Sequence, residues 1–305
     1  MEFGFALPQT GAHASPQTIV RAAQEAERHG YATVWVLERL LRPLHPRTAS
    51  GKHPGPSMPD NYAIAYDPLE TLSYVAAKTE RIKLGTSVIV APFHAPVVVA
   101  KQLATLDQFS GGRVVAGLGQ GWSEEEFVTA NIPLRRRGAG FEEFVSAMRA
   151  AWGPDPVSFT GRFYRIPESQ IGPKPLQPSG PPVIIAANER AAIERAGRIG
   201  DGLHPIAADW SKLEQAIHGF RSAARMTGRN PDALSIVVRS NTAVSEKPAN
   251  DPRPPLSGCH EQVVEDLNRL RTLGVNEVFF DMNRFPITVD QQFRLLDRLR
   301  TAAKA

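Results

Sequence analysis

The chain has 305 residues, of which 42% are hydrophobic and 22% charged, the proportions of a soluble globular protein with a substantial core. Its 35 basic and 31 acidic residues are mixed along the chain and leave a net charge of +4, which argues against a basic stripe for nucleic acid. The single cysteine, Cys259, excludes an internal disulfide and favours a reducing compartment. The start, MEFGFALP, lacks the basic region of a signal peptide and no apolar run is long enough to span a bilayer, so we expect a cytoplasmic protein without membrane or nucleic-acid partners.

The first third of the chain alternates between strand and helix. Residues 2–7 predict a short strand, and Ser15-Pro16 predict a helix start with serine as the N-cap and proline in the first turn. A second strand over residues 33–37 ends at Glu38-Arg39. Residues 42–66 then form a long loop rich in proline, glycine and histidine. Because loops of this length are usually functional, we predict a substrate or lid loop.

Residues 81–122 predict a parallel strand–helix–strand unit. The apolar runs at 82–90 and 114–118 lack polar alternation, which is typical of strands buried on both faces in a parallel sheet. Between them, apolar residues recur with helical spacing up to Ser110-Gly111-Gly112, which ends the helix. The loops that follow the two strands therefore emerge at the same edge of the sheet.

The remainder continues this alternation. Residues 153–181 carry many prolines and glycines around a short alternating segment and predict an inserted hairpin. Further strands are expected over residues 182–187, 202–207, 234–244 and 275–281, each followed by a helix. Capping boxes are expected at the helix starts Ser123 to Glu126 and Thr288 to Gln291. Eight strands that alternate with helices predict a single α/β domain over residues 1–305 with the (β/α)8 TIM-barrel fold.

In such a barrel the site lies where the strands end. That edge collects Pro8-Gln9, Glu38-Arg39, Ser87 to His94, Gly119 to Trp122, Ala187-Asn188, His204, Arg239 and Asp281 to Asn283. Two charges at the end of an apolar strand are costly unless paired or facing a cleft, so we interpret Glu38 and Arg39 as site residues, with an ion pair as the alternative. His94, in a turn between prolines, is either a proton donor or a surface histidine. Trp122 is either a stacking wall or a lid.

Two turns invite comparison with phosphate-binding motifs. Gly117, Gly119 and Gly121 resemble a dinucleotide fingerprint, but the third glycine is misplaced and three glutamates that would repel a pyrophosphate follow. We therefore interpret these glycines as positions where a flat ligand approaches the backbone. The turn Ala187-Asn188-Glu189-Arg190-Ala191 offers N–H groups at a helix start and is a candidate phosphate site, with a plain Asn188 N-cap and a salt bridge as the alternative.

Other kinds of catalytic motif do not occur in the sequence. The eight histidines are scattered, and neither HExxH nor CxxC is present, so we expect no metal. The nucleophile motif GxSxG is absent as well. A barrel enzyme without a metal or a nucleophile is expected to take its chemistry from an organic cofactor.

Several segments together resemble a known family. AQEAERHGYATVWVLERL (23–40), residues 79–122 and PVIIAANERAAIERAGRIGDG (182–202) resemble the bacterial luciferase-like superfamily, and within it the actinobacterial deazaflavin-dependent oxidoreductases. Residues 157–166, 173–178 and 260–281 fit the same pattern, so the resemblance covers nearly the whole chain. It implies a (β/α)8 barrel that holds coenzyme F420 or FMN at the strand C-termini, in a protein expected to be a homodimer.

The resemblance also implies roles for particular residues. Ser87-Val88 would carry a non-prolyl cis peptide behind the cofactor ring, Asn188 to Ala191 would match the phosphate-binding turn, and Glu38 and Gln120 would lie at the ring edge. Sugar-phosphate dehydrogenases of the superfamily have histidine at the position of Arg39 and glutamate at that of Trp122, so a hexose phosphate substrate is not expected. The cofactor-binding set is Glu38, Ser87, Val88, Gly119, Gln120, Gly121, Ala187, Asn188, Glu189, Arg190 and Ala191.

The leading hypothesis is hydride transfer between bound coenzyme F420 and a small organic substrate. In this hypothesis Glu38, Arg39, His94 and Trp122 surround the reacting carbon: His94 or Glu38 is the proton partner, Arg39 binds a substrate anion or a ring carbonyl, and Trp122 forms the pocket wall. The alternative is an FMN-dependent monooxygenase in which reduced flavin activates oxygen and a separate flavin reductase supplies electrons. A third hypothesis is a flavin-binding protein without turnover.

Overall fold

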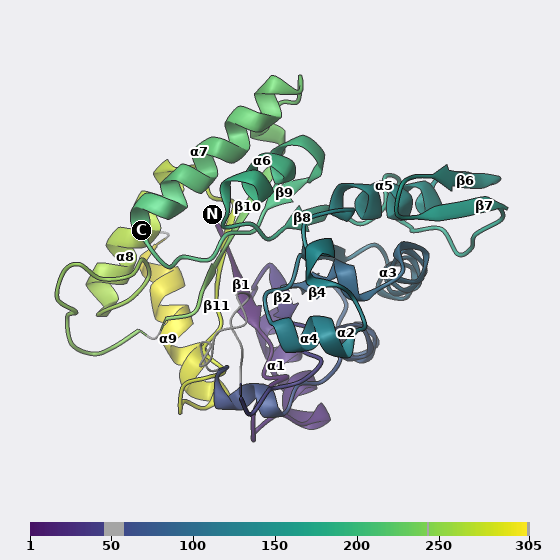
Figure 1. Ribbon diagram of the computed structural model, residues 1–305. Helices are drawn as coiled ribbons and strands as arrows, with labels where there is room; N and C mark the ends of the chain where they lie inside the picture. The colour runs from purple at the N-terminus through teal and green to yellow at the C-terminus, as the bar shows by residue number, and fades with distance from the viewer. Residues whose placement is uncertain (46–57, 243, 304–305) are drawn as a thin grey trace. The chain divides into compact units, whose positions relative to one another are not determined.

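The computed structural model describes residues 1–45, 58–242 and 244–303 (Figure 1). Its strands are β1 (Glu2–Ala6), β2 (Thr33–Val36), β3 (Lys83–Thr86), β4 (Ile89–Val90), β5 (Val114–Gly119), β6 (Val157–Thr160), β7 (Arg165–Ser169), β8 (Val183–Ile185), β9 (Gly202–Leu203), β10 (Ser235–Ser240) and β11 (Glu277–Phe280). Its longer helices are α1 (Pro16–Arg28), α2 (Pro68–Ala76), α3 (Pro96–Ser110), α4 (Glu124–Thr129), α5 (Phe141–Trp152), α6 (Arg190–Ile199), α7 (Trp210–Met226), α8 (His260–Thr272) and α9 (Val289–Ala302).

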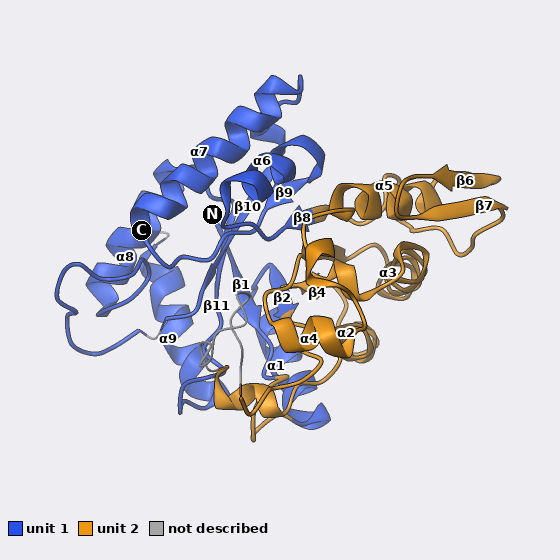
Figure 2. Cartoon of the chain, viewed as in Figure 1, with its two compact units in different colours: residues 1–8, 15–35, 184–305 blue, residues 9–14, 36–183 orange. Residues whose placement is uncertain are grey.

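The strand order confirms the predicted fold class. Hydrogen-bonded neighbours follow the order β3-β2-β1-β11-β10-β9-β8-β5, and β5 also pairs with β3, so eight strands close a barrel. β4 continues the line of β3 and pairs with the end of β5. Helices alternate with these strands along the chain, as in a (β/α)8 barrel. By its internal packing the chain groups into two compact units: unit 1 comprises residues 1–8, 15–35 and 184–305, and unit 2 comprises residues 9–14 and 36–183 (Figure 2). A single domain over residues 1–305 stays a prediction.

Unit 1 is built on parallel strands with apolar side chains. Phe5 of β1 lies opposite Phe280 of β11 and Val34 of β2, and its ring stacks on Phe293 of α9 at a centroid distance of 4.3 Å. Burying large aromatic rings of this kind stabilises the fold through both area and ring geometry. The helix α9 begins with the predicted capping box, in which the Thr288 hydroxyl accepts a hydrogen bond from the Gln291 amide.

A carboxylate is buried among these strands. Glu277 accepts hydrogen bonds from the Thr33 hydroxyl at 3.0 Å and from the Trp35 indole N–H at 2.7 Å. Space for this contact depends on Gly4, because a Cβ there would lie 2.4 Å from the Glu277 Oε1. Buried carboxylates need such donors, so this cluster serves the fold of unit 1.

In unit 2, α2 packs against β3, α3 packs against β5, and α5 packs on α3. The Thr86 hydroxyl donates to the Gly117 carbonyl at 2.8 Å and accepts from the Gly117 amide at 2.9 Å. A Cβ on Gly117 would lie 1.8 Å from the Thr86 carbonyl oxygen. The close approach that this glycine permits is therefore between two strands, and the approach of a flat ligand to Gly117 stays a prediction.

The predicted insertion contains the antiparallel hairpin of β6 and β7 beside α5 (Figure 2). Glu143 of α5 accepts hydrogen bonds from the amides of Phe163 and Tyr164, which lie in the turn between β6 and β7. Of the predicted loop at residues 42–66, residues 46–57 lie outside the described part of the chain, and the rest includes the short 3-10 helix η1 (Asp60–Ala63). Among the described residues, no helix has the length and apolarity that a membrane span requires.

Candidate active site

A carboxylate–imidazole pair lies just beyond β2 in unit 2. Glu38 Oε1 is 2.7 Å from His94 Nε2, and Glu38 Oε2 accepts a hydrogen bond from the Val90 amide at 2.6 Å. Only 5% of Glu38 is exposed. With both oxygens held, Glu38 fixes the orientation of the imidazole and leaves Nδ1 as the ring nitrogen that it does not engage.

The backbone around this pair holds the strand ends together. The Ser87 amide donates to the Val36 carbonyl at 2.6 Å, and the Glu38 amide donates to the Val88 carbonyl at 3.3 Å. The peptide bond between Ser87 and Val88 is cis, which confirms the expectation drawn from the resemblance. It lies where β3 gives way to β4. Contact of Ser87 and Val88 with a cofactor stays a prediction.

The surroundings of His94 raise its pKa. Burial by itself lowers the pKa of the imidazole, but the hydrogen bond and the negative charge of Glu38, helped by the charge of Asp67, outweigh this effect. The protonated form of His94 is therefore favoured relative to a free histidine. A histidine in this state can donate a proton near neutral pH.

Arg39 is enclosed by two rings and a carboxylate. Its Nη1 lies 2.7 Å from Glu126 Oε2, and its guanidinium carbon lies 5.1 Å from the ring centroid of Tyr62 and 5.0 Å from that of Trp122. The ion-pair alternative for Arg39 is thus present in the structure. Trp122 is 42% exposed and contributes a flat apolar surface beside the guanidinium.

Glu126 belongs to this cluster and was missed by sequence reasoning. It is completely buried on α4, and its Oε1 accepts a hydrogen bond from the Leu40 amide at 3.0 Å. Burial raises its pKa, the charge of Arg39 opposes the rise, and the charge of Glu38 adds to it.

The predicted capping box at the start of α4 was wrong, because the Ser123 side chain makes no cap hydrogen bond and instead bonds to Glu125. The only local signal for a buried Glu126 is its position beside Phe127, which is itself buried.

The loop after β5 contributes a buried donor. Gln120 Nε2 has no hydrogen-bond partner among the described residues. Gly121 adopts a φ of +73°, and a Cβ there would lie 2.8 Å from Val90 Cγ1. Gly121 is therefore required by the turn and by protein packing, and its contact with a ligand stays a prediction. Gly119 ends β5 opposite Val90, and its contact with a ligand stays a prediction.

In unit 1, the predicted phosphate turn leads into α6. Glu189 is the N-cap residue and makes no side-chain cap bond, so the assignment of Asn188 as the cap was wrong. Asn188 Oδ1 instead lies 3.5 Å from the Ile206 amide. Arg190 pairs with Glu194 at 2.8 Å and is 92% exposed. The first-turn amides of α6 thus lack a side-chain cap, and a phosphate seat at residues 187–191 stays a prediction.

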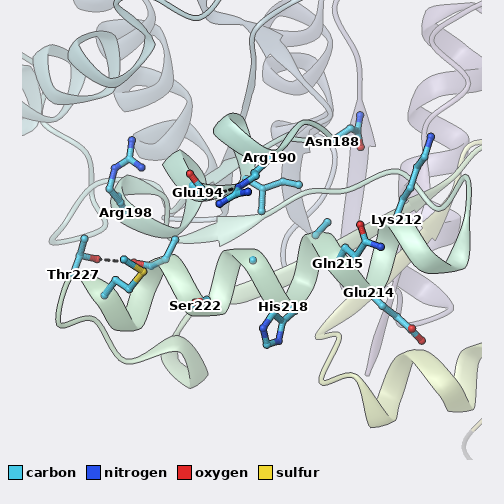
Figure 3. A pocket seen from close by; sticks show the side chains of 15 residues that line it. Asn188, Arg190, Glu194, Arg198, Lys212, Glu214, Gln215, His218, Ser222 and Thr227 are labelled. Carbon is cyan, nitrogen blue, oxygen red and sulfur yellow. Dashed lines mark hydrogen bonds and ion pairs between the residues drawn. The ribbon is translucent and has the colours of Figure 1, made fainter.

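Beside this turn, unit 1 has a groove of about 1070 Å³ between α6 and α7 (Figure 3). Arg198, Lys212 and His218 line it together with apolar side chains such as Ile193. Within the groove, Arg190 and Glu194 form an ion pair. Because both helices pack closely along their length, the groove follows the outer seam between them.

Four further predicted strand-end residues have structural partners. In unit 1, Arg239 forms an ion pair with Asp281. Burial lowers the pKa of His204 to about 4, and its Nδ1 lies 2.7 Å from the Val237 carbonyl oxygen, so this histidine is neutral. In unit 2, the Gln9 amide group donates to the carbonyls of Leu37 and Tyr66. Among the described residues, no group of three or more histidines, cysteines and acids is placed to hold a metal ion.

Comparisons with known proteins find relatives in sequence and in structure. A family model described as luciferase-like monooxygenase matches residues 1–250. An F420-dependent glucose-6-phosphate dehydrogenase of Amycolatopsis mediterranei is 33% identical over 258 residues, which are 81% of this chain and 72% of that protein. An FMNH(2)-dependent dimethylsulfone monooxygenase of Pseudomonas putida is 36% identical over 162 residues, which are 52% of this chain and 44% of that protein.

Among solved structures, one similar chain is an F420-dependent secondary alcohol dehydrogenase in complex with an F420–acetone adduct. It superposes with a TM-score of 0.80 at 20% sequence identity, and the match covers 100% of this chain and 99% of that one. At this identity the likeness establishes the shared fold.

Proposed function

Because the chain belongs to the luciferase-like monooxygenase family, we propose that this enzyme uses bound coenzyme F420 for hydride transfer to or from a small organic substrate. The observation that carries the proposal is the Glu38–His94 pair, a carboxylate that holds an imidazole in a form able to give up a proton. The relative from Amycolatopsis mediterranei supports the choice of the deazaflavin.

The residues of unit 2 fit a flavin-type ring. Such a ring carries carbonyl oxygens and ring nitrogens along its edge, and these groups accept hydrogen bonds. Gln120 Nε2 is a buried N–H donor without a partner among the described residues. Since an unpaired buried donor costs about 1–3 kcal/mol, a ligand with acceptor atoms would relieve this cost.

When bound, the deazaflavin supplies a hydride, and the residues of the chain supply the rest. Reduction of a carbonyl adds a hydride to carbon and a proton to oxygen, so a proton donor is required. Glu38 holds His94 Nε2, and His94 Nδ1 would deliver the proton to the substrate oxygen. Glu38 acts as the positioning residue because both its oxygens are already engaged. In the reverse direction, neutral His94 would accept the proton from an alcohol.

The alternative, an FMN-dependent monooxygenase with a separate reductase, is supported by the relative from Pseudomonas putida. The two are separated by titrating the protein with each cofactor and following absorbance. We expect saturable binding of coenzyme F420 and binding of FMN that is weaker by about tenfold or more, equivalent to about 1.4 kcal/mol. Tight binding of FMN without binding of coenzyme F420 would refute the proposal.

A matched variant tests the roles within the site. His94→Gln should bind coenzyme F420 as the unchanged protein does but should lose about 10²–10⁴-fold in turnover, the usual contribution of a general acid. If coenzyme F420 binds tightly but no substrate in a broad screen oxidises it, the third hypothesis, a binding protein without turnover, would be favoured instead. A homodimer is part of the proposal and is tested by measuring the mass in solution.

A further inference from the structure

We propose that Glu126 determines substrate class: by neutralising Arg39 between Tyr62 and Trp122, it makes this wall of the site select uncharged planar carbonyl compounds over anions. The cluster of Tyr62, Arg39, Trp122 and Glu126 is called the arginine stack below. The inference rests on the proposed function, since the stack is taken to face the substrate. Its test measures ligand binding without a cofactor, so the two can fail separately.

The charge of Arg39 is already satisfied. Glu126 Oε2 lies 2.7 Å from Arg39 Nη1. The guanidinium carbon of Arg39 lies 5.1 Å from the ring centroid of Tyr62 and 5.0 Å from that of Trp122. Only 12% of the Arg39 side chain is exposed, and 1% of that of Glu126. An anionic substrate at this arginine would bring a second negative charge next to a buried carboxylate, which is strongly unfavourable in a poorly solvated place.

The neighbouring pair adds no net charge. Glu38 is adjacent to Arg39 in the chain and holds His94, so the four groups comprise two carboxylates, one guanidinium and one imidazole that is favoured in its protonated form. Their charges cancel when the imidazole is protonated. Binding of a substrate anion, one of the two roles predicted for Arg39, is therefore disfavoured, and an uncharged acceptor such as a carbonyl oxygen is favoured.

Trp122 supplies the recognition of planar groups. It is 42% exposed although it is a large apolar ring, and the guanidinium of Arg39 is its partner in the stack. Stacking of an aromatic group on such a ring strengthens binding by about two- to tenfold beyond the effect of the area buried. A flat conjugated molecule gains this contribution, whereas a saturated ring of the same size does not.

A donor of the arginine stack supplies the recognition of oxygen. Arg39 Nε is buried and has no hydrogen-bond partner among the described residues. It is an N–H donor, so it matches an acceptor such as a carbonyl oxygen rather than a hydroxyl hydrogen or a cation.

Four probes of similar size test each part of the inference. Acetophenone is planar, uncharged and has a carbonyl; ethylbenzene lacks the carbonyl; cyclohexyl methyl ketone lacks the planar ring; benzoate is planar but anionic. Binding to the cofactor-free protein is measured by NMR titration. We expect acetophenone to bind about tenfold more tightly than each of the others. Benzoate binding as tightly as acetophenone, or the saturated ketone doing so, would overturn the inference.

Variants assign the selectivity to Glu126. In Glu126→Gln, benzoate affinity should rise by about tenfold, while that of acetophenone stays within about twofold. Glu125→Gln, on the same helix, is the matched control and should leave all four affinities unchanged. An equal rise of benzoate affinity in both variants would show a general charge effect and overturn the proposal.

If Glu126→Gln does not fold, the exposed ring provides the second test. Trp122→Ala should lose the preference for acetophenone over cyclohexyl methyl ketone, while Trp122→Phe should keep most of it. Retention of the full preference in Trp122→Ala would contradict the assignment of this ring as the stacking surface.

Discussion

Replacing Glu38 by glutamine should shift the protonation of His94 toward the neutral form. The substitution keeps the size of the side chain, and the glutamine carbonyl can still accept the Val90 amide hydrogen bond that Glu38 accepts at 2.6 Å. It removes the negative charge 2.7 Å from His94 Nε2. That charge and hydrogen bond are what raise the pKa of His94 against the effect of burial, so without them burial prevails and the pKa falls.

The size of the effect follows from the strength of the hydrogen bond between the carboxylate and the imidazole. A hydrogen bond to a charged group contributes about 1.5–3 kcal/mol. At a fixed pH, the ratio of protonated to neutral His94 should therefore fall by about ten- to hundredfold, since each 1.4 kcal/mol corresponds to about a factor of ten. If His94 delivers the proton, the rate of carbonyl reduction near neutral pH should fall by a comparable factor.

The assay is an NMR titration of the His94 ring signals, identified by their absence from the spectrum of His94→Gln. Glu80→Gln is the control because this glutamate is exposed and distant in sequence, and it should leave the titration of His94 unchanged. A His94 midpoint in Glu38→Gln that equals or exceeds that of the unchanged protein would refute the reasoning about the pair.

Three further predictions concern the fold. Gly117→Ala places a Cβ against the Thr86 backbone and should lower the free energy of unfolding, measured with urea, by about 3 kcal/mol or more. The control Gly219→Ala, in α7, meets only ordinary contacts and should be neutral or stabilising by up to about 1 kcal/mol. Thr33→Val leaves Glu277 without one donor and should destabilise the protein by about 1–3 kcal/mol, while Thr33→Ser should retain most of the stability. Because the pKa of His204 is lowered to about 4, the unfolded chain binds a proton below about pH 6.5 that the folded chain does not bind. About 3 kcal/mol of stability should therefore be lost as the pH falls from about 6.5 to about 4, and His204→Phe should abolish this part of the dependence of stability on pH.

Local patterns predicted the elements well. The alternation of apolar strands and amphipathic helices is encoded within short windows, as are the Ser15 and Thr288 caps, and both caps are present. The weak strand predicted for residues 202–207 is shorter in the structure, where β9 ends at Leu203. Pro205 lacks an N–H and interrupts the ladder, which resumes as an isolated parallel bridge between Ile206 and Arg239.

Contacts between distant segments could not be predicted in the same way. Glu126 lies 87 residues from its partner Arg39, and His94 lies 56 residues from Glu38. A pattern within a window assigned Glu126 to a capping box, because nothing local distinguishes a cap from a carboxylate that reaches across the fold. The strand-packing role of Gly117 was hidden for the same reason, since its neighbour Thr86 is 31 residues away.

The most direct test of hydride transfer uses reduced coenzyme F420, the protein and a panel of ketones headed by acetophenone, mixed without dioxygen. We predict that absorbance reports substrate-dependent oxidation of the cofactor, and that His94→Gln slows it by about 10²-fold or more. Two results together would contradict hydride transfer and establish the monooxygenase alternative. The first is that coenzyme F420 is not oxidised without dioxygen, and the second is substrate-dependent uptake of dioxygen when reduced FMN is supplied.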